Sequence, residues 1–167
     1  WRNTEDPWKI LLLEVISQQT QLDRANKYYQ KFIRKFPSPY EMSKATKKEI
    51  LGMWSGLGYN NRAVRLHEAS KILSKNSFDS IYPEFDILPG VGEYTKNAIL
   101  SFAYNDKVIT QDTNVLRVFS RFFGTKDPKK FILENQKNIL KNIKSRKFNE
   151  VLMDFGSEIC TSKNPSC

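Results

Sequence analysis

Residues Leu88–Ile99 read LPGVGEYTKNAI and carry the clearest information about architecture. Gly90 and Gly92 lie in a tight turn that leads into a helical pattern, and such a turn leaves backbone N–H groups exposed at a helix N-terminus. Those groups bind anions, so the turn predicts a phosphate contact. An ordinary turn that uses glycine for its positive φ is the alternative. The segment lacks the Gly-Lys-Ser/Thr ending of a nucleotide-binding P-loop, which argues against bound ATP.

Helical patterns occupy most of the chain on both sides of this turn. Apolar residues recur at intervals of three and four, proline and glycine mark the ends, and Thr46 with Glu49 fits a capping box. Only Lys107–Thr110 (KVIT) hints at a strand, and it is too short and solitary to build a sheet. The sequence therefore predicts an all-α fold. The expected helices cover residues 7–17, 23–36, 50–54, 62–73, 95–102, 113–123, 128–144 and 148–159.

The composition narrows the class of protein. The 167 residues carry 27 Lys and Arg against 18 Asp and Glu, a formal net charge of +9. This favours a polyanionic partner, nucleic acid before an acidic membrane, over the alternative of a merely Lys-rich soluble protein. No apolar run approaches the roughly 20 residues that span a bilayer, so we expect no membrane segment. Cys160 and Cys167 lie at the C-terminal end, which argues against a disulfide-stapled secreted fold. We expect an intracellular protein, excised from a longer chain.

One carboxylate interrupts the apolar segment Lys9–Gln21, KILLLEVISQQTQ. If Glu14 is buried there, it should be neutral or bridged, because an isolated buried charge costs several kcal/mol. A carboxylic acid with a raised pKa can protonate a leaving group near neutral pH. The alternative is that Glu14 lies on a solvated edge of its helix.

A second carboxylate, Asp112, follows the hairpin segment in VITQDTNVLRVFSRFF, at the N-cap position of a helical pattern. Capping alone would explain a lone aspartate. The helix dipole also favours its ionised form, which can stabilise a cationic, oxocarbenium-like sugar centre.

Together these segments resemble the helix-hairpin-helix DNA glycosylase superfamily, whose turn holds a DNA backbone phosphate and whose motif ends in such an aspartate. The strings LLLEVISQQTQL, WSGLGYNNRAVRLHEA (Trp54–Ala69) and FNEVLMDFGSEICTSKNPSC (Phe148–Cys167) resemble MutY-type adenine-DNA glycosylases in particular, and WRNTEDPW at the start also fits. The resemblance covers nearly the whole chain. It implies two helical lobes: a six-helix barrel over approximately residues 22–110, with the hairpin at 83–103, and a second lobe from residues 1–21 and 111–167.

The resemblance implies a base-excision-repair enzyme that acts as a monomer on double-stranded DNA. It would hydrolyse the N-glycosidic bond of adenine opposite 8-oxoguanine or guanine. Glu14 would protonate the adenine, and Asp112 would stabilise the sugar cation. Tyr94 stands where lyase-competent relatives, such as endonuclease III, carry a nucleophilic lysine, which implies a monofunctional hydrolase. Lys96 would point elsewhere on that helix.

The resemblance also implies DNA contacts. Gln18 and Gln19 would read the opposing base, and Tyr59 would enter the stack as the target base flips out. A monovalent cation would bind at the hairpin turn. The full set of implied DNA-binding residues is Gln18, Gln19, Thr20, Tyr59, Arg62, Leu88, Gly90, Val91, Gly92, Thr95 and Asn114.

Cys160 and Cys167 match the first two ligands of the family's Cys-x6-Cys-x2-Cys-x5-Cys iron–sulfur loop. The resemblance implies a [4Fe–4S] cluster in the intact parent. Two thiolates cannot hold such a cluster alone, so either the parent continues to the other two ligands or the loop is a relic. The resemblance also implies a C-terminal 8-oxoguanine-recognition domain in that parent.

Two departures leave the base preference open: Ser17 replaces a bulky apolar residue, and Asn60 replaces the second aromatic of a Gly-Tyr-Tyr turn. A thymine/uracil mismatch glycosylase shares the hairpin, a tyrosine at position 94 and the aspartate. The alternative of another class is a catalytically silent helix-hairpin-helix DNA-binding module, against which Glu14 and Asp112 argue. His67, the only histidine, is expected on the surface of a basic helix rather than in catalysis.

Overall fold

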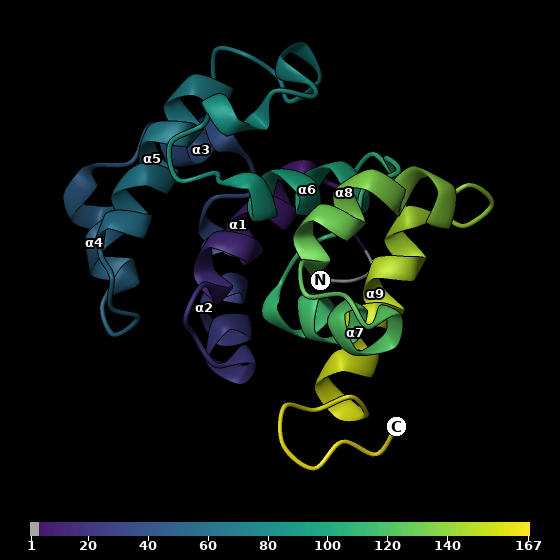
Figure 1. Ribbon diagram of the computed structural model, residues 1–167. Helices are drawn as coiled ribbons and strands as arrows, with labels where there is room; N and C mark the ends of the chain where they lie inside the picture. Colours follow the sequence, from purple (N-terminus) through teal and green to yellow (C-terminus); the bar gives the residue numbers. More distant parts are fainter. Residues whose placement is uncertain (1–3) are drawn as a thin grey trace. The chain divides into compact units, whose positions relative to one another are not determined.

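The computed structural model describes residues 4–167, and within that range all regular structure is helical (Figure 1). Nine α-helices and two short 3-10 helices form in these residues, without a strand, so the predicted all-α class is confirmed. Every helix in the described range is too short or too polar to cross a bilayer. Residues 1–3 of the matched N-terminal string lie outside the described residues.

Two compact units divide the described chain: the residues up to Ile99, and Leu100–Cys167. The division falls inside helix α6 (Glu93–Phe102). Helix α1 (Pro7–Ser17) belongs to the first unit. The predicted lobes place residues 1–21 with the C-terminal segment instead, and those lobe boundaries stay a proposal.

Helix α1 is buried along most of its length. Asp6 begins it as N-cap, with Oδ1 accepting hydrogen bonds from the N–H groups of Trp8 (2.9 Å) and Lys9 (3.4 Å). Its apolar run packs against α2 (Leu22–Lys35) and α5 (Asn61–Leu73) (Figure 1). Full burial of one such leucine or isoleucine contributes roughly 1.5–3 kcal/mol, so the run fixes α1 inside the first unit.

Two short helices follow α2. Ser38 and Pro39 begin α3 (Pro39–Ser43). This helix was not expected, because Pro39 also fits the end of the preceding helix. The predicted capping box begins α4 (Lys47–Trp54): the Thr46 N–H donates to Glu49 Oε2 (2.8 Å), and the Glu49 N–H donates to Thr46 Oγ1 (3.2 Å). These caps place α4 ahead of the Gly-rich turn at residues 55–60.

The expectation of a surface His67 is wrong. Helix α3 packs across α5 and covers this side chain, which is 5% exposed. Burial lowers the pKa of His67 below its ordinary value of 6.5, although hydrogen bonds with the backbone of Ser43 and Ala45 act in the opposite direction. His67 is therefore a core residue that connects α5 to the end of α3.

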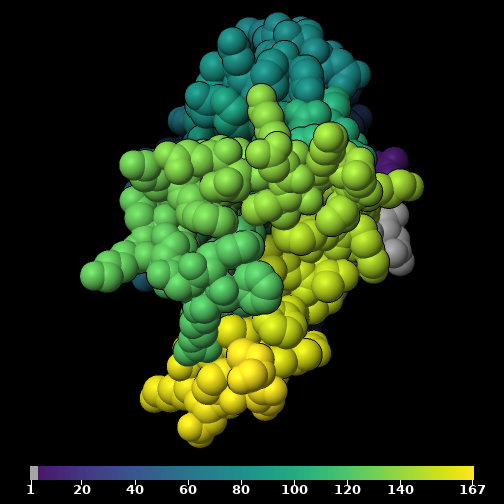
Figure 2. Space-filling view, turned by 45° about the vertical axis from the view of Figure 1, so that its right-hand side comes forward, coloured from purple at the N-terminus to yellow at the C-terminus, as the bar shows by residue number. Residues whose placement is uncertain are grey.

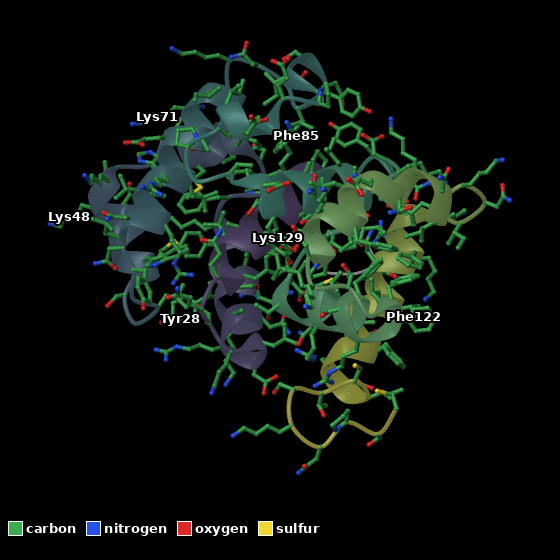
Figure 3. All side chains as sticks on the ribbon, viewed as in Figure 1. Tyr28, Lys48, Lys71, Phe85, Phe122 and Lys129 are labelled. Atoms are coloured by element: carbon green, nitrogen blue, oxygen red, sulfur yellow. The ribbon has the colours of Figure 1, made fainter. Side chains whose placement is uncertain are left out.

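Two 3-10 helices, η1 (Asp79–Ile81) and η2 (Phe85–Ile87), lead into the hairpin turn. Phe85, labelled in Figure 3, is fully buried and contacts the rings of Phe78 and Tyr82 edge-on. This aromatic cluster supports the turn from the N-terminal side.

The second unit packs α7 (Thr113–Phe123) against α8 (Pro128–Ile139) and α9 (Ser145–Glu158). Figure 2 shows the face on which α7 and α8 (green) border α9 and the C-terminal segment (yellow). The buried core of this unit consists of Ile109, Val115, Phe119, Ile132 and Leu140.

Helix α8 ends earlier than the predicted residue 144, because the chain turns after Leu140 and α9 begins at Ser145. Ser145 is fully buried, and its Oγ donates a hydrogen bond to the carbonyl of Val108 (2.7 Å). A continuous helix through residue 144 would lose this contact. The early end of α8 therefore depends on a tertiary hydrogen bond that local sequence does not reveal.

Candidate functional site

The first unit contains a pocket of about 780 Å³. It brings together three segments: the turn after α1, the Gly-rich turn before α5, and the first turns of α5. Three predicted site residues from two turns, Gln18, Gln19 and Tyr59, thus meet at one place, with predicted Arg62 beside them. The lining residues are Gln18, Gln19, Tyr59, Asn60, Asn61, Arg62 and Arg65.

Glu14 lies one helical turn before this pocket. Its side chain is buried, with 7% exposure, within the apolar part of α1. The Gln18 N–H donates to the Glu14 carbonyl (3.3 Å), which ends the helix and turns the chain into the Gln18–Thr20 segment. The solvated-edge alternative for Glu14 does not hold in this structure.

Two non-glycine residues of the pocket have left-handed backbones. Gln19 has a φ of 52° and Tyr59 a φ of 49°, and Tyr59 is 67% exposed. Such conformations are uncommon outside glycine and cluster at functional sites. The family resemblance assigns both residues to DNA contact, so the strained backbone conformations fall on predicted contact residues.

The Gly-rich turn at residues 55–60 is held by side chains of α2 and α4. The Tyr28 hydroxyl, on α2 in Figure 3, donates to the Ser55 carbonyl (2.6 Å), and Arg24 donates to the Gly56 carbonyl. Trp54 Nε1 donates to the Gly58 carbonyl (2.9 Å). Gly56 has a φ of 96°, and a β-carbon there would lie 2.6 Å from the Tyr28 hydroxyl. The turn is therefore built around glycine and is rigidly supported.

Arg62 extends from α5 to both turns. Its Nη1 donates to carbonyls at the end of α1, and its Nη2 donates to the carbonyls of Leu57 (3.3 Å) and Gly58 (3.2 Å). Burial lowers the pKa of Arg62, although it stays charged near neutral pH. Sequence reasoning missed Arg65, which lies on the same face of α5 and lines the same pocket.

The hairpin turn lies beside this pocket. A smaller pocket of about 30 Å³ has Gln18, Arg65 and Gly90 among its lining residues. Gly90 has a φ of 86°, and a β-carbon on it would come within 3.1 Å of Arg65 Cβ. Gly92 differs, because a β-carbon there would meet nothing within 4 Å. The two glycines of the motif therefore have different structural requirements.

The remaining predicted hairpin residues divide into buried and half-buried positions. Leu88, Val91 and Thr95 are buried and hold the turn to the unit. Tyr94 is half-buried in the first turn of α6. Lys96 lies 2.5 Å from Asp86 on the side of η2, and this ion pair lowers the pKa of Asp86.

In the second unit, Asp112 is the N-cap of α7, as predicted. Its Oδ1 accepts a hydrogen bond from the Val115 N–H (2.7 Å). Asn114 is held to α9: its Oδ1 accepts from Arg117 Nη2 (2.9 Å), and the same guanidinium donates to the carbonyls of Gly156 and Cys160. Arg117 therefore connects the start of α7 to the C-terminal part of α9.

The segment before Asp112 has no regular secondary structure, and the side-chain amide of Asn149 holds part of it. Asn149 is fully buried; its Oδ1 accepts from the Thr110 N–H (2.8 Å), and its Nδ2 donates to the carbonyl of Val108 (2.9 Å). Its Nδ2 also contacts the buried hydroxyl of Ser101 (2.8 Å). The sequence offered no signal for this role, because an asparagine in a helix is usually exposed.

Cys160 is buried and Cys167 is exposed. Arg121 Nη1 donates to Cys160 Sγ (3.4 Å), and this hydrogen bond lowers the pKa of the Cys160 thiol. Among residues 4–167, no group of three His, Cys, Asp or Glu side chains could hold a metal ion. These two thiols supply half of a [4Fe–4S] ligand set, so the residues present do not hold such a cluster by themselves.

The known proteins that this chain resembles are described as DNA repair proteins and DNA glycosylases. Residues 12–141 match the family described as HhH-GPD superfamily base excision DNA repair protein. The whole chain is 38% identical to an adenine DNA glycosylase from Buchnera aphidicola subsp. Baizongia pistaciae, but it spans only 50% of that protein. It is 33% identical to a thymine/uracil-DNA glycosylase from Methanothermobacter thermautotrophicus, of which it covers 80%. The structure of a thermostable thymine-DNA glycosylase superposes with a TM-score of 0.89 at 31% identity, covering 100% of this chain and 81% of that one.

Proposed function

Because the chain belongs to the HhH-GPD superfamily of base excision DNA repair proteins, we propose that it is the catalytic core of a monofunctional DNA glycosylase. Its substrate is double-stranded DNA in which adenine is mispaired with 8-oxoguanine or guanine. The observation that carries this proposal is the pocket that joins Gln18 and Gln19 to Tyr59, one helical turn from the buried Glu14. The net charge of +9 suits a polyanionic partner.

The proposed reaction breaks the bond between the sugar C1′ and the adenine ring. Glu14 gives a proton to the adenine, which departs with the electron pair of the broken bond. The carboxylate of Asp112, held at the N-terminus of α7, stabilises the positive charge left on the sugar. Water then adds its oxygen to C1′ and releases a proton, leaving free adenine and an abasic site. Tyr94 offers no amine for a Schiff base, so strand cleavage is not part of the reaction.

The proposed DNA contacts come from the two turns and the hairpin. Tyr59 is exposed on a strained, supported turn, which suits a side chain that enters the base stack as adenine flips out. Gln18 and Gln19 read the opposing base, and Thr20 beside them contacts the DNA. The hairpin amides after Gly90 bind a phosphate of the DNA backbone.

Two bound groups remain predictions. A [4Fe–4S] cluster in the intact parent would use Cys160 and Cys167 as two of its ligands, and no step of the proposed reaction involves it. A monovalent cation at the hairpin turn stays a prediction as well.

A thymine/uracil mismatch glycosylase is the second candidate. It is favoured by the relative from Methanothermobacter thermautotrophicus, because this chain covers 80% of it, and by a tyrosine at position 94. The buried Glu14 favours adenine, since thymine and uracil can leave as stabilised anions and need an acid less. The two candidates therefore differ in the base that leaves the sugar: adenine in the first, and thymine or uracil in the second.

One experiment separates them. The protein is incubated with duplexes that carry A·8-oxoG, A·G, T·G or U·G, and the products are cleaved with alkali at abasic sites. We expect strand breaks at adenine in the first two duplexes and none before alkali. Breaks confined to T·G and U·G would establish the second candidate, and breaks in none of the four duplexes would contradict glycosylase activity on these mispairs.

A further inference from the structure

The Arg62 guanidinium contacts two separate stretches of backbone. On one side, Nη1 donates to the carbonyls of Val15 (3.1 Å), Ile16 (3.2 Å) and Gln18. On the other, Nη2 donates to the carbonyls at positions 57 and 58 at 3.3 Å and 3.2 Å. A single side chain therefore joins the end of α1 to the Gly-rich turn.

Two of these carbonyls, those of Val15 and Ile16, lie at the end of α1 and need a donor from outside the helix. The last carbonyls of a helix lack partners within it, and those of α1 are partly buried here. The guanidinium also lies 5.1 Å from the Trp54 ring centroid and 5.6 Å from that of Tyr59. The plane of the guanidinium and the N–H groups of Nη1 and Nη2 are thus engaged by the protein itself, whereas the buried Nε has no hydrogen-bond partner among the described residues.

Two of these carbonyls, those of Gln18 and Gly58, each precede a residue with a left-handed backbone. The Gln18 carbonyl belongs to the peptide group that precedes Gln19, and the Gly58 carbonyl belongs to the peptide group that precedes Tyr59. Gln19 and Tyr59 are the two non-glycine residues of the pocket with left-handed backbones, a conformation that is strained for such residues. Arg62 fixes the peptide plane immediately before each strained residue.

We propose that Arg62 is a positioning residue that holds Gln19 and Tyr59 in one arrangement, rather than a residue that binds a DNA phosphate. This inference rests on the proposed function, in which those two side chains enter the duplex together. Arg62 is among the residues that the family resemblance assigns to DNA contact. A phosphate contact through Nη1 or Nη2 would have to compete with the backbone carbonyls that these atoms already bind.

Arg62→Lys is the discriminating variant. Lysine keeps the positive charge, but its single ammonium group cannot reach both sets of carbonyls in the geometry of a planar guanidinium. Arg34→Lys is the matched control, since Arg34 is exposed on α2 and does not line the pocket.

The first measurement does not depend on catalysis. Amide hydrogen exchange of the free protein reports local opening, and the Thr20 and Leu57 amides are suitable probes because each donates to a backbone carbonyl, of Ser17 (3.1 Å) and Trp54 (3.0 Å) respectively. We expect Arg62→Lys to raise exchange at both probes by about tenfold or more, and Arg34→Lys to leave both unchanged. Faster exchange at only one probe, or at neither, would overturn the inference.

The second measurement separates positioning from phosphate binding. Single-turnover excision from the A·8-oxoG duplex should fall by about 10- to 100-fold in Arg62→Lys at saturating protein, because misplaced groups lose rate rather than affinity. The dissociation constant for the duplex should stay within about threefold of the wild type. A weaker dissociation constant with an unchanged saturated rate would make Arg62 a phosphate contact.

Two outcomes keep the inference and the proposed function distinguishable. If the wild type excises no base, yet Arg62→Lys raises exchange at both probes, the proposed function fails and the role of Arg62 in the free protein stands. If Arg62→Lys does not fold, exchange of the wild type is followed in increasing urea. The Thr20 and Leu57 amides should then open with the same free energy and the same urea dependence, and separate openings would overturn the coupling.

Discussion

The backbone of Gly156 lies directly against Asn114, so that a β-carbon on Gly156 would come within 2.8 Å of Asn114 Cβ and within 3.3 Å of its carbonyl carbon. Asn114 is in the first turn of α7, two residues after Asp112. The close approach of α9 to this turn is therefore possible only because residue 156 lacks a side chain.

Gly156→Ala should destabilise the protein by about 1–3 kcal/mol, since Asn114 is held by Arg117 and cannot move without loss of that hydrogen bond. Gly52→Ala is the control: this glycine lies in α4, and its added β-carbon would meet nothing within 4 Å. The control should stabilise by about 0.5–1 kcal/mol. Urea unfolding measures both, and changes of the same sign would contradict the assignment.

Asp112→Asn should abolish base excision while duplex binding stays within about tenfold, because the lost charge acts on the sugar cation and not on phosphate. Asparagine is as good an N-cap as aspartate, so α7 should keep its stability. Single-turnover rates and thermal unfolding test the two statements separately. Excision at the wild-type rate would remove Asp112 from the mechanism.

Glu14→Gln should lower adenine release by roughly 10²–10⁴-fold, because the amide keeps the shape of the side chain but has no transferable proton. The same variant should act on T·G duplexes much as the wild type does. Rates on A·8-oxoG and T·G duplexes under single-turnover conditions provide the comparison. Rapid T·G processing by a variant whose parent ignores adenine would favour the thymine/uracil candidate.

Gly90→Ala and Gly92→Ala should differ in the free protein. Gly90 has a φ of 86° and lies against Arg65, so its substitution should cost about 1 kcal/mol or more of folding stability; the Gly92 site leaves room for a β-carbon. Both should weaken binding to all duplexes alike, because both β-carbons obstruct phosphate at the turn amides. Binding titrations with several duplexes check this, and loss for one mispair alone would place the turn at the base.

His67 should make folding stability fall in mild acid. Because burial lowers its pKa in the folded state, only the unfolded chain gains the proton as the pH drops below about 6.5. Its contribution is fully present above that pH and decreases as the pH falls toward the folded-state pKa, by at most about 1.4 kcal/mol per pH unit. His67→Gln should reduce the slope of unfolding free energy against pH between 7.5 and 5. Nearby Lys71 and Glu68 stay in both proteins, and equal slopes would assign the effect to other groups.

Local signals in the sequence were sufficient to predict the all-α class and several helix ends. Helix ends at Asp6, Thr46 and Asp112 follow from side chains that cap their own helices, so residues a few positions apart determine them. The family resemblance assigned Gln18 and Tyr59 to DNA contact, but no local pattern places them in one pocket, because the two lie on turns far apart in the chain.

Three features could not be predicted from the sequence, because each depends on contacts between segments that are distant in the chain. His67 lies among basic residues in the sequence, which is typical of an exposed helix. The packing of α3 against α5 buries it. Arg62 reads as a DNA-binding arginine, because nothing nearby in the sequence reveals the carbonyls at the end of α1. The early end of α8 has the same origin, in the hydrogen bond from Ser145 to Val108.

The segment Val108–Thr110, which has no regular secondary structure, affects the tendency of the protein to aggregate. It is the most β-prone stretch of the second unit, and an unpaired extended backbone is a template for aggregation. Here side-chain amides make the hydrogen bonds that a neighbouring strand would make. Gln136 Oε1 accepts from the Ile109 N–H (2.9 Å). Asn149 accepts from the Thr110 N–H and donates to the Val108 carbonyl. A strand from another molecule would find these three backbone groups already occupied, so the segment is protected from intermolecular β-pairing without a sheet of its own.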